Sequence, residues 1–185
     1  YYDFSTKYLN SINENIRNIV GDAFSEELDY IEIENVKSYN LLDFYKNALP
    51  KKDPKIQYSH YLSYIHGDLN GANIIIDGHE NVWLIDFFHT HRGHILKDLI
   101  KFENDLLYIF TPINSKEEFE EGCSLIKAIT DIEDLWNPLN QVKLQSPQFI
   151  KAYNTIKHLR GFYKSLVQTD RDPLQLFLGM LRYSV

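Results

Sequence analysis

The stretch His66–Asp86, HGDLNGANIIIDGHENVWLID, constrains the fold of this chain more than any other part. Three consecutive isoleucines, Ile74–Ile76, precede the turn-forming pair Asp77-Gly78. The apolar run at 82–85 then follows the turn. β-branched and apolar runs on either side of an Asp-Gly pair are typical of a β-hairpin. We therefore predict a two-stranded antiparallel hairpin within this stretch.

The register of this hairpin brings two polar residues together. Its loop is centred near His79, with Asn73 six residues before the centre and Asp86 seven residues after it. Because residues at similar distances from the loop lie close together across a hairpin, we expect Asn73 and Asp86 to lie side by side at its open end.

The rest of the chain is predicted to be mainly helical. Apolar residues at intervals of three or four residues predict helices before the hairpin at 4–20 (Phe4, Tyr8, Ile12, Ile16 and Val20), 38–49 and 58–65. The same spacing and several cap residues predict helices after it at 95–110, from Ser115, from Ser146-Pro147 through Leu166, and from Asp172-Pro173. Residues 26–34 fit a short helix or a strand, and Lys51–Lys55 fits a solvated loop.

Composition narrows the class of protein. The net charge is −7 and no basic run is present, which disfavours nucleic acid as a partner because phosphate contacts need clustered Lys and Arg. No apolar run approaches the length of a membrane span. The single cysteine, Cys123, excludes an intrachain disulfide and favours a cytoplasmic location; we expect it to be a buried core thiol. The chain starts at Tyr1, so we expect a fragment of a larger protein that contains other domains.

The polar residues of the central stretch suit phosphoryl transfer. This reaction needs a carboxylate that orients the attacking hydroxyl group, and oxygen ligands that hold Mg²⁺ against the phosphates. Asp68 fits the first role, and Asn73 with Asp86 fits the second. Taken one at a time, these residues would suit turns and strand ends equally well.

The sequence HGDLNGAN resembles the protein-kinase catalytic loop H-R-D-x-x-x-x-N, and Asp86-Phe87-Phe88 resembles the metal-binding D-F-G. Gly67 in place of Arg is similar to the aminoglycoside and choline kinase branch of the kinase-like superfamily. The resemblance covers residues 66–103. It implies these roles: Asp68 as catalytic base, Asn73 and Asp86 as metal ligands, His66 as a support of the loop, and Asp98 as a hydrogen-bonding brace of that loop. Asp98 alone also suits the first turn of a helix, where the dipole favours a carboxylate.

The segment WLIDFFHTHRGHILKDLIKFE also resembles the kinase-like, ternary-complex-associated domains of large bacterial signalling and conflict-system proteins. Two features depart from a complete kinase. Phe88 replaces the glycine of D-F-G, and the eight glycines form no G-x-G-x-x-G or P-loop. We therefore predict a mainly α (α+β) fold: a kinase-like C-terminal lobe with a β-hairpin at its catalytic edge and no N-lobe in this chain. It forms one domain over 1–185, with leading helices at 1–65, the catalytic loop and metal hairpin at 66–86, and a helical remainder at 87–185.

Three functions follow as hypotheses. The first is transfer of the γ-phosphoryl group of ATP, with Mg²⁺, to a hydroxyl group of a small molecule. The second is a catalytically inactive pseudokinase or ligand-binding module that works with other domains of the same polypeptide. The third is a zinc hydrolase using His89, His91 and His94, although their spacing in a predicted loop lacks further ligands. We expect no nucleic acid and no membrane as partner.

Overall fold

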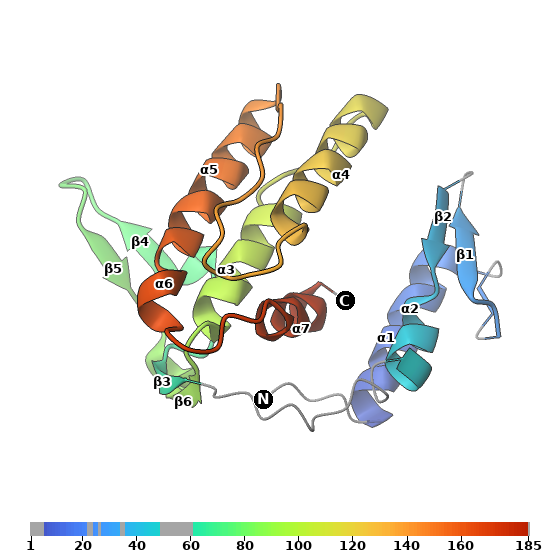
Figure 1. Cartoon of the computed structure of the whole chain (residues 1–185), viewed down its shortest axis with the longest axis horizontal. Coiled ribbons are helices and arrows are strands. Elements are labelled where there is room, and N and C mark those ends of the chain that lie inside the picture. The colour runs from blue at the N-terminus through green and yellow to red at the C-terminus, as the bar shows by residue number, and fades with distance from the viewer. Residues whose placement is uncertain (1–5, 22–23, 26, 34–35, 49–60, 185) are drawn as a thin grey trace. The chain divides into compact units, whose positions relative to one another are not determined.

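The computed structural model describes residues 6–21, 24–25, 27–33, 36–48 and 61–184 (Figure 1). The chain divides into two compact units, Tyr2–Tyr58 and Ser59–Ser184, called here the N-terminal and C-terminal units. Both contain helices and antiparallel strands, which confirms the α+β class. The single domain and the kinase-like lobe stay predictions. None of the helices in the described ranges has the length and apolar character needed to span a membrane.

The N-terminal unit begins with helix α1, Thr6–Val20, as the apolar spacing predicted. Gly21 follows with a φ of +66°, the left-handed conformation common just after a helix. Phe4, at the start of the predicted helix, and the predicted loop Lys51–Lys55 lie outside the described residues.

A hairpin that is separate from the central one follows α1. Strand β1, Tyr30–Ile33, pairs antiparallel with β2, Val36–Tyr39, and the helical turns α2, Leu41–Asp43, and η2, Phe44–Ala48, come after it. The prediction of a helix from Ser38 is wrong for its first residues, because Ser38 pairs with Ile31 across the sheet.

Asn40 sets the boundary between this sheet and the helical turns. Its Oδ1 accepts a hydrogen bond from Leu42 N at 3.1 Å, and its Nδ2 donates to Leu28 O at 2.6 Å. A side-chain oxygen that accepts from the first helical turn is the usual start of a helix. The helix therefore begins after Asn40 and not at Ser38.

The C-terminal unit begins with strand β3, Leu62–Ile65, which pairs antiparallel with β6, His91–His94. The helix predicted at 58–65 is therefore wrong over its described part. The leading helices predicted at 1–65 are interrupted by the strands β1, β2 and β3. The loop predicted at His89–His94 is wrong from His91 onward, because these residues form β6. Leu62 pairs with His94 and Ile65 with His91, and these long-range hydrogen bonds override a spacing that suited a helix.

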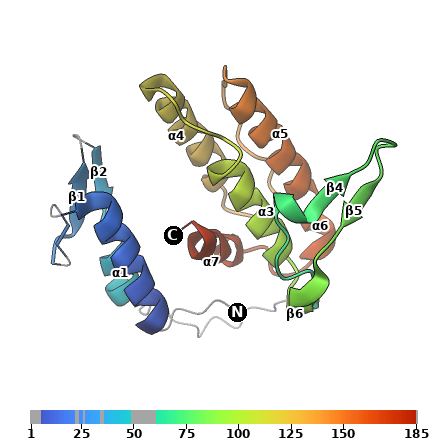
Figure 2. The same ribbon diagram turned by 180° about the vertical axis from the view of Figure 1, so that it is seen from behind.

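The central hairpin has the predicted register. Strand β4, Ile74–Ile76, pairs with β5, Val82–Leu84, with Ile74 opposite Leu84 and therefore with His79 at the centre. Figures 1 and 2 show this hairpin projecting away from the helices of its unit. Most of its apolar side chains are exposed.

The loop of this hairpin is organised by Asp77. Its carboxylate accepts hydrogen bonds from His79 N, from Asn81 N and Nδ2, and from Trp83 Nε1, at 2.8–3.1 Å. These bonds favour the charged form and hold the pKa of Asp77 at about 2.

We expect acid to release this loop with a midpoint near pH 2. A carboxylate whose pKa is lowered by folding stabilises the hairpin above its ordinary pKa, and this stabilisation is lost as the pH falls through about 2. An NMR titration of the Trp83 indole N–H would measure the midpoint, with Asp77→Asn as the variant that abolishes it. The Trp136 indole, which donates to Val167 O, is the internal control. A Trp83 midpoint near the ordinary value of 3.8 would contradict the assignment.

Helices make up the rest of the C-terminal unit: α3, Lys97–Tyr108; α4, Lys116–Thr130; α5, Pro147–Gly161; α6, Tyr163–Leu166; and α7, Leu174–Tyr183. The predicted helices of this region are confirmed, except that the helix expected through Leu166 is divided at Phe162. Ser115 Oγ accepts from Glu118 N at 3.1 Å, as the capping box predicted.

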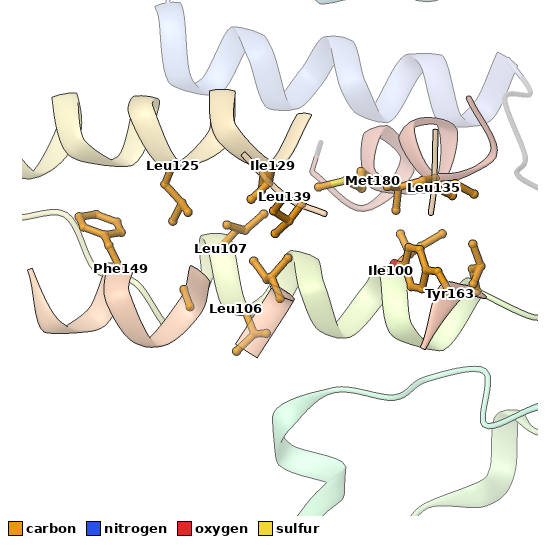
Figure 3. Packing of buried hydrophobic residues seen from close by; sticks show 14 of the residues in the cluster. Ile100, Leu106, Leu107, Leu125, Ile129, Leu135, Leu139, Phe149, Tyr163 and Met180 are labelled. Carbon is orange, nitrogen blue, oxygen red and sulfur yellow. The ribbon is translucent and has the colours of Figure 1, made fainter. Parts of the chain in front are cut away.

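One core joins these helices (Figure 3). It includes Leu96 at the N-cap of α3, Ile100 of α3, Leu125 and Ile129 of α4, and Ile156 of α5, all at most 1% exposed. The prediction of a buried Cys123 is wrong, because that thiol is exposed. The buried face of α4 instead includes Gly122, Leu125 and Ile129, which lie at helical spacing.

Candidate functional site

The loop between β3 and β4 carries most of the predicted site residues, and helix α3 holds it in place. Asp98 lies in the first turn of α3, and its carboxylate accepts hydrogen bonds from the backbone N–H groups of His66 at 2.6 Å and Gly67 at 2.9 Å. Hydrogen bonds to a carboxylate are stronger than those between neutral groups. Asp98 therefore fixes the start of the loop, which is the contact that the kinase resemblance implies for it.

His66 links this loop to the open end of the hairpin, just after β5. The side chain is buried, and its Nε2 lies 2.8 Å from Ile85 O. The ring also packs against Phe87, with ring centroids 4.9 Å apart. Because Ile85 and Phe87 flank Asp86, His66 positions the backbone on both sides of that residue.

Asp68 projects from the loop and is about one-third exposed. Its Oδ1 lies 3.2 Å from Lys101 Nζ on α3, and Asn70 Nδ2 donates to its Oδ2 at 3.4 Å and to its backbone oxygen at 3.1 Å. Partial burial acts to raise the pKa of Asp68, but the Lys101 ammonium and the Asn70 amide outweigh it, so the pKa is lower than usual. Asp68 is therefore ionised at neutral pH and can accept a hydrogen bond from a hydroxyl group.

Asn73 and Asp86 lie next to the paired strands at the open end of the hairpin. Ile85 N donates to Asn73 O at 3.1 Å, which places Asp86 next to Asn73 along the paired strands. Asn73 is buried, and its Nδ2 donates to Asp68 O at 2.9 Å. This bond directs the amide nitrogen toward the loop and leaves Oδ1 as the atom able to bind a cation.

The backbone of Asp86 is left-handed, with a φ of 62° and a ψ of 59°. This conformation is uncommon for residues other than glycine and often occurs at functional sites. The side chain is exposed. The structure thus presents a carboxylate at the position where the kinase resemblance places a metal ligand.

The donor set at this end of the hairpin fits Mg²⁺. Asn73 Oδ1 and the Asp86 carboxylate are hard oxygen ligands, and Mg²⁺ is commonly held by one or two protein groups together with phosphates and water. No cluster of three or more His, Cys, Asp and Glu side chains suited to a metal occurs in the described ranges. These residues would therefore hold the ion only together with a phosphate ligand.

The histidines of the zinc hypothesis do not converge. His91 and His94 are three residues apart on strand β6, so their side chains project from opposite faces. His91 Nδ1 contacts His89 O at 2.7 Å, and His94 is buried with Nδ1 accepting from Leu96 N. The zinc hypothesis is therefore wrong, because these three histidines are not arranged to bind one metal ion.

Helix α3 contributes two further residues that the sequence did not assign. Asp98, Lys101 and Asp105 lie at i, i+3 and i+7, which places them on one face of the helix. Lys101 contacts Asp68, and Asp105 accepts a hydrogen bond from the backbone of Gly71. Burial raises the pKa of Asp105, although the Lys101 charge and the Gly71 bond oppose the rise. Helical spacing from Asp98 is the signal that could have identified both.

Comparison with known proteins identifies the family. The family model described as "Ternary complex associated domain 9" matches residues 5–183, so the chain belongs to this family. No curated protein and no solved structure matches the chain. The predicted resemblance to ternary-complex-associated domains is confirmed, and the wider kinase-like assignment stays a prediction.

Proposed function

We propose that this ternary-complex-associated domain is the helical lobe of a kinase-like phosphotransferase, which moves the γ-phosphoryl group of ATP to a hydroxyl group of a small molecule with Mg²⁺. One observation supports the proposal: hydrogen bonds link the loop that carries Asp68 to Asn73, and Asn73 to the strand end beside Asp86. Asn73 is the link, because its amide donates to Asp68 O and its backbone oxygen accepts from Ile85 N beside Asp86.

Each residue has a role that its surroundings support. Asp68 orients the hydroxyl group and accepts its proton. Asn73 Oδ1 and the Asp86 carboxylate hold Mg²⁺, which neutralises the charge of the phosphates when bound. His66 and Asp98 keep the loop and the hairpin in register, so that the three functional groups need little rearrangement before the reaction.

The exposed face of the hairpin supports nucleotide binding. Ile75 and Trp83 are paired across β4 and β5, and their side chains are 46% and 56% exposed. Paired residues share one face of a hairpin, so this pair forms an apolar surface close to Asn73. A purine ring could stack on it, since aromatic and apolar side chains bind bases through their flat faces.

A second candidate function is a nucleotide-binding module without catalysis, in an assembly with other domains or proteins. Two observations favour it. The ion pair with Lys101 lowers the pKa of Asp68, which makes this carboxylate a weaker base. The family description also refers to association with a ternary complex.

Replacing Asp68 with asparagine tests the first function. We expect phosphoryl transfer from Mg-ATP to a panel of hydroxyl compounds to fall by about 10²–10⁴-fold, because the general base is lost. ADP release by the full-length protein that contains this domain is the measurement. Glu120→Gln on α4, a side chain two-thirds exposed, is the control that should keep full activity. Equal activity in Asp68→Asn and the wild type would refute the role of Asp68, and nucleotide binding without transfer would favour the second function.

A further inference from the structure

Lys101 is the cation that the structure places against the predicted catalytic carboxylate. Its Nζ lies 3.2 Å from Asp68 Oδ1, and its side chain is only 20% exposed. The loop itself, residues 66–73, contains no Lys and no Arg. The basic partner of Asp68 comes instead from helix α3. Asp98 fixes this helix against the loop, because it accepts hydrogen bonds from two loop N–H groups.

Lys101 lies near more carboxylates than the single one with which it forms an ion pair. Three carboxylates lie on or against the loop: Asp68, Asp98 and Asp105. Without Lys101, a phosphoryl group that approaches Asp68 would meet this negative charge. An ammonium group has three rotatable donors, so Lys101 can keep one hydrogen bond to Asp68 and direct another toward a phosphate oxygen.

We propose that Lys101 binds the γ-phosphoryl group of the nucleotide and holds it against Asp68 during transfer. This inference rests on the proposed function and adds a residue to it. Lys101 would contact an oxygen of the transferring group, where preorganised positive charge stabilises the transition state. The chain would thus supply from a helix the cation that its loop lacks.

The proposed step is balanced. A bond forms between the acceptor hydroxyl oxygen and the γ-phosphorus, and the bond from that phosphorus to the β,γ-bridging oxygen breaks. The bond electrons leave with ADP, and the hydroxyl proton passes to the Asp68 carboxylate. Lys101 takes no proton and forms no covalent bond in this step, so its contribution is electrostatic.

Calorimetric titration with Mg-ATP and Mg-ADP tests the role of Lys101 apart from catalysis. We expect Lys101→Met to weaken ATP binding by about 10–100-fold, the effect of one charged hydrogen bond, and to leave ADP binding unchanged. Lys101→Arg should keep most of the preference for ATP. The control is Lys116→Met on α4, whose side chain is 84% exposed. Circular dichroism would establish that each variant is folded.

The outcomes separate this inference from the proposed function. Loss of ATP preference in Lys101→Met, without any phosphoryl transfer by the wild type, would support Lys101 and refute the catalysis. Transfer that depends on Asp68, with equal ATP and ADP affinities in the wild type and in Lys101→Met, would overturn only the Lys101 role. An equal loss of affinity for both nucleotides would indicate a purely structural ion pair and would also overturn it. A folded chain that binds neither nucleotide would overturn both proposals.

Discussion

Replacing Arg160 with methionine is expected to lower the free energy of unfolding of the C-terminal unit by about 3–5 kcal/mol. The Arg160 guanidinium binds the Glu103 carboxylate through two hydrogen bonds, Nε to Oε1 at 2.7 Å and Nη2 to Oε2 at 2.9 Å. Glu103 is fully buried and Arg160 is only 6% exposed. Removal of the guanidinium would leave a buried carboxylate without its cation.

The pair also connects three helices. Glu103 lies on α3, Arg160 on α5, and Arg160 Nη1 donates to Ile129 O at the end of α4. Burial acts to lower the pKa of Arg160, but the Glu103 charge outweighs it and the pKa is raised, so the guanidinium stays charged. Because α3 also carries Asp98 and Lys101, the pair stabilises the helix that holds the candidate site.

Urea unfolding followed by circular dichroism would measure the change. Arg171→Met is the matched control: its partner is Asp134, its side chain is about half exposed, and surface pairs contribute at most about 1 kcal/mol. We expect the double variant Glu103→Leu/Arg160→Met to recover much of the loss, because it removes both buried charges. A single Arg160→Met variant as stable as the Arg171→Met control would contradict the prediction.

Local signals in the sequence predicted the central hairpin and the helices of the C-terminal unit. The register of β4 and β5 depends on residues within a few positions of the turn, so the pair Ile74 and Leu84 could be placed from the sequence alone. Likewise, Ser115 and Glu118 lie three residues apart and cap the helix that they begin.

Long-range pairing could not be predicted in this way. Strand β3 forms because Leu62–Ile65 pairs with His91–His94, a segment far along the chain. The apolar spacing up to Ile65 suits a helix locally, and no residue near it indicates the partner strand. The hairpin of β1 and β2 shows the same effect, since Ser38 suits a helix start until it pairs with Ile31.

The candidate site contains residues that local sequence signals indicate and a residue that they do not. Asp68, Asn73 and Asp86 could be proposed as site residues because they lie within the loop and hairpin that the sequence itself defines. Lys101 could not be assigned by proximity in sequence, since it contacts Asp68 from another element. It could have been found by helical geometry: once Asp98 is placed against the loop, the residue three positions on must face the loop as well.

Replacing Gly67 with alanine is expected to destabilise the C-terminal unit by about 2–5 kcal/mol, the sum of a left-handed backbone and an overpacked side chain. Gly67 has a φ of +86°, and a Cβ atom there would lie 2.1 Å from His89 O and 2.9 Å from His91 Nδ1. The two segments cannot move apart easily, because His91 is paired with β3 in the sheet and Gly67 N donates a hydrogen bond to Asp98.

Gly78→Ala is the matched control, since no atom lies within 4 Å of its Cβ position and its φ is not left-handed. We expect the free energy of unfolding of this control to lie within about 0.5 kcal/mol of the wild-type value. NMR spectra should also show that the His66 and Gly67 amides shift in Gly67→Ala, because the loop must move away from Asp98. A Gly67→Ala variant with unchanged stability and unchanged amide shifts would mean that the loop has room for a side chain. The close passage of residues 89–91 thus explains why glycine occupies position 67.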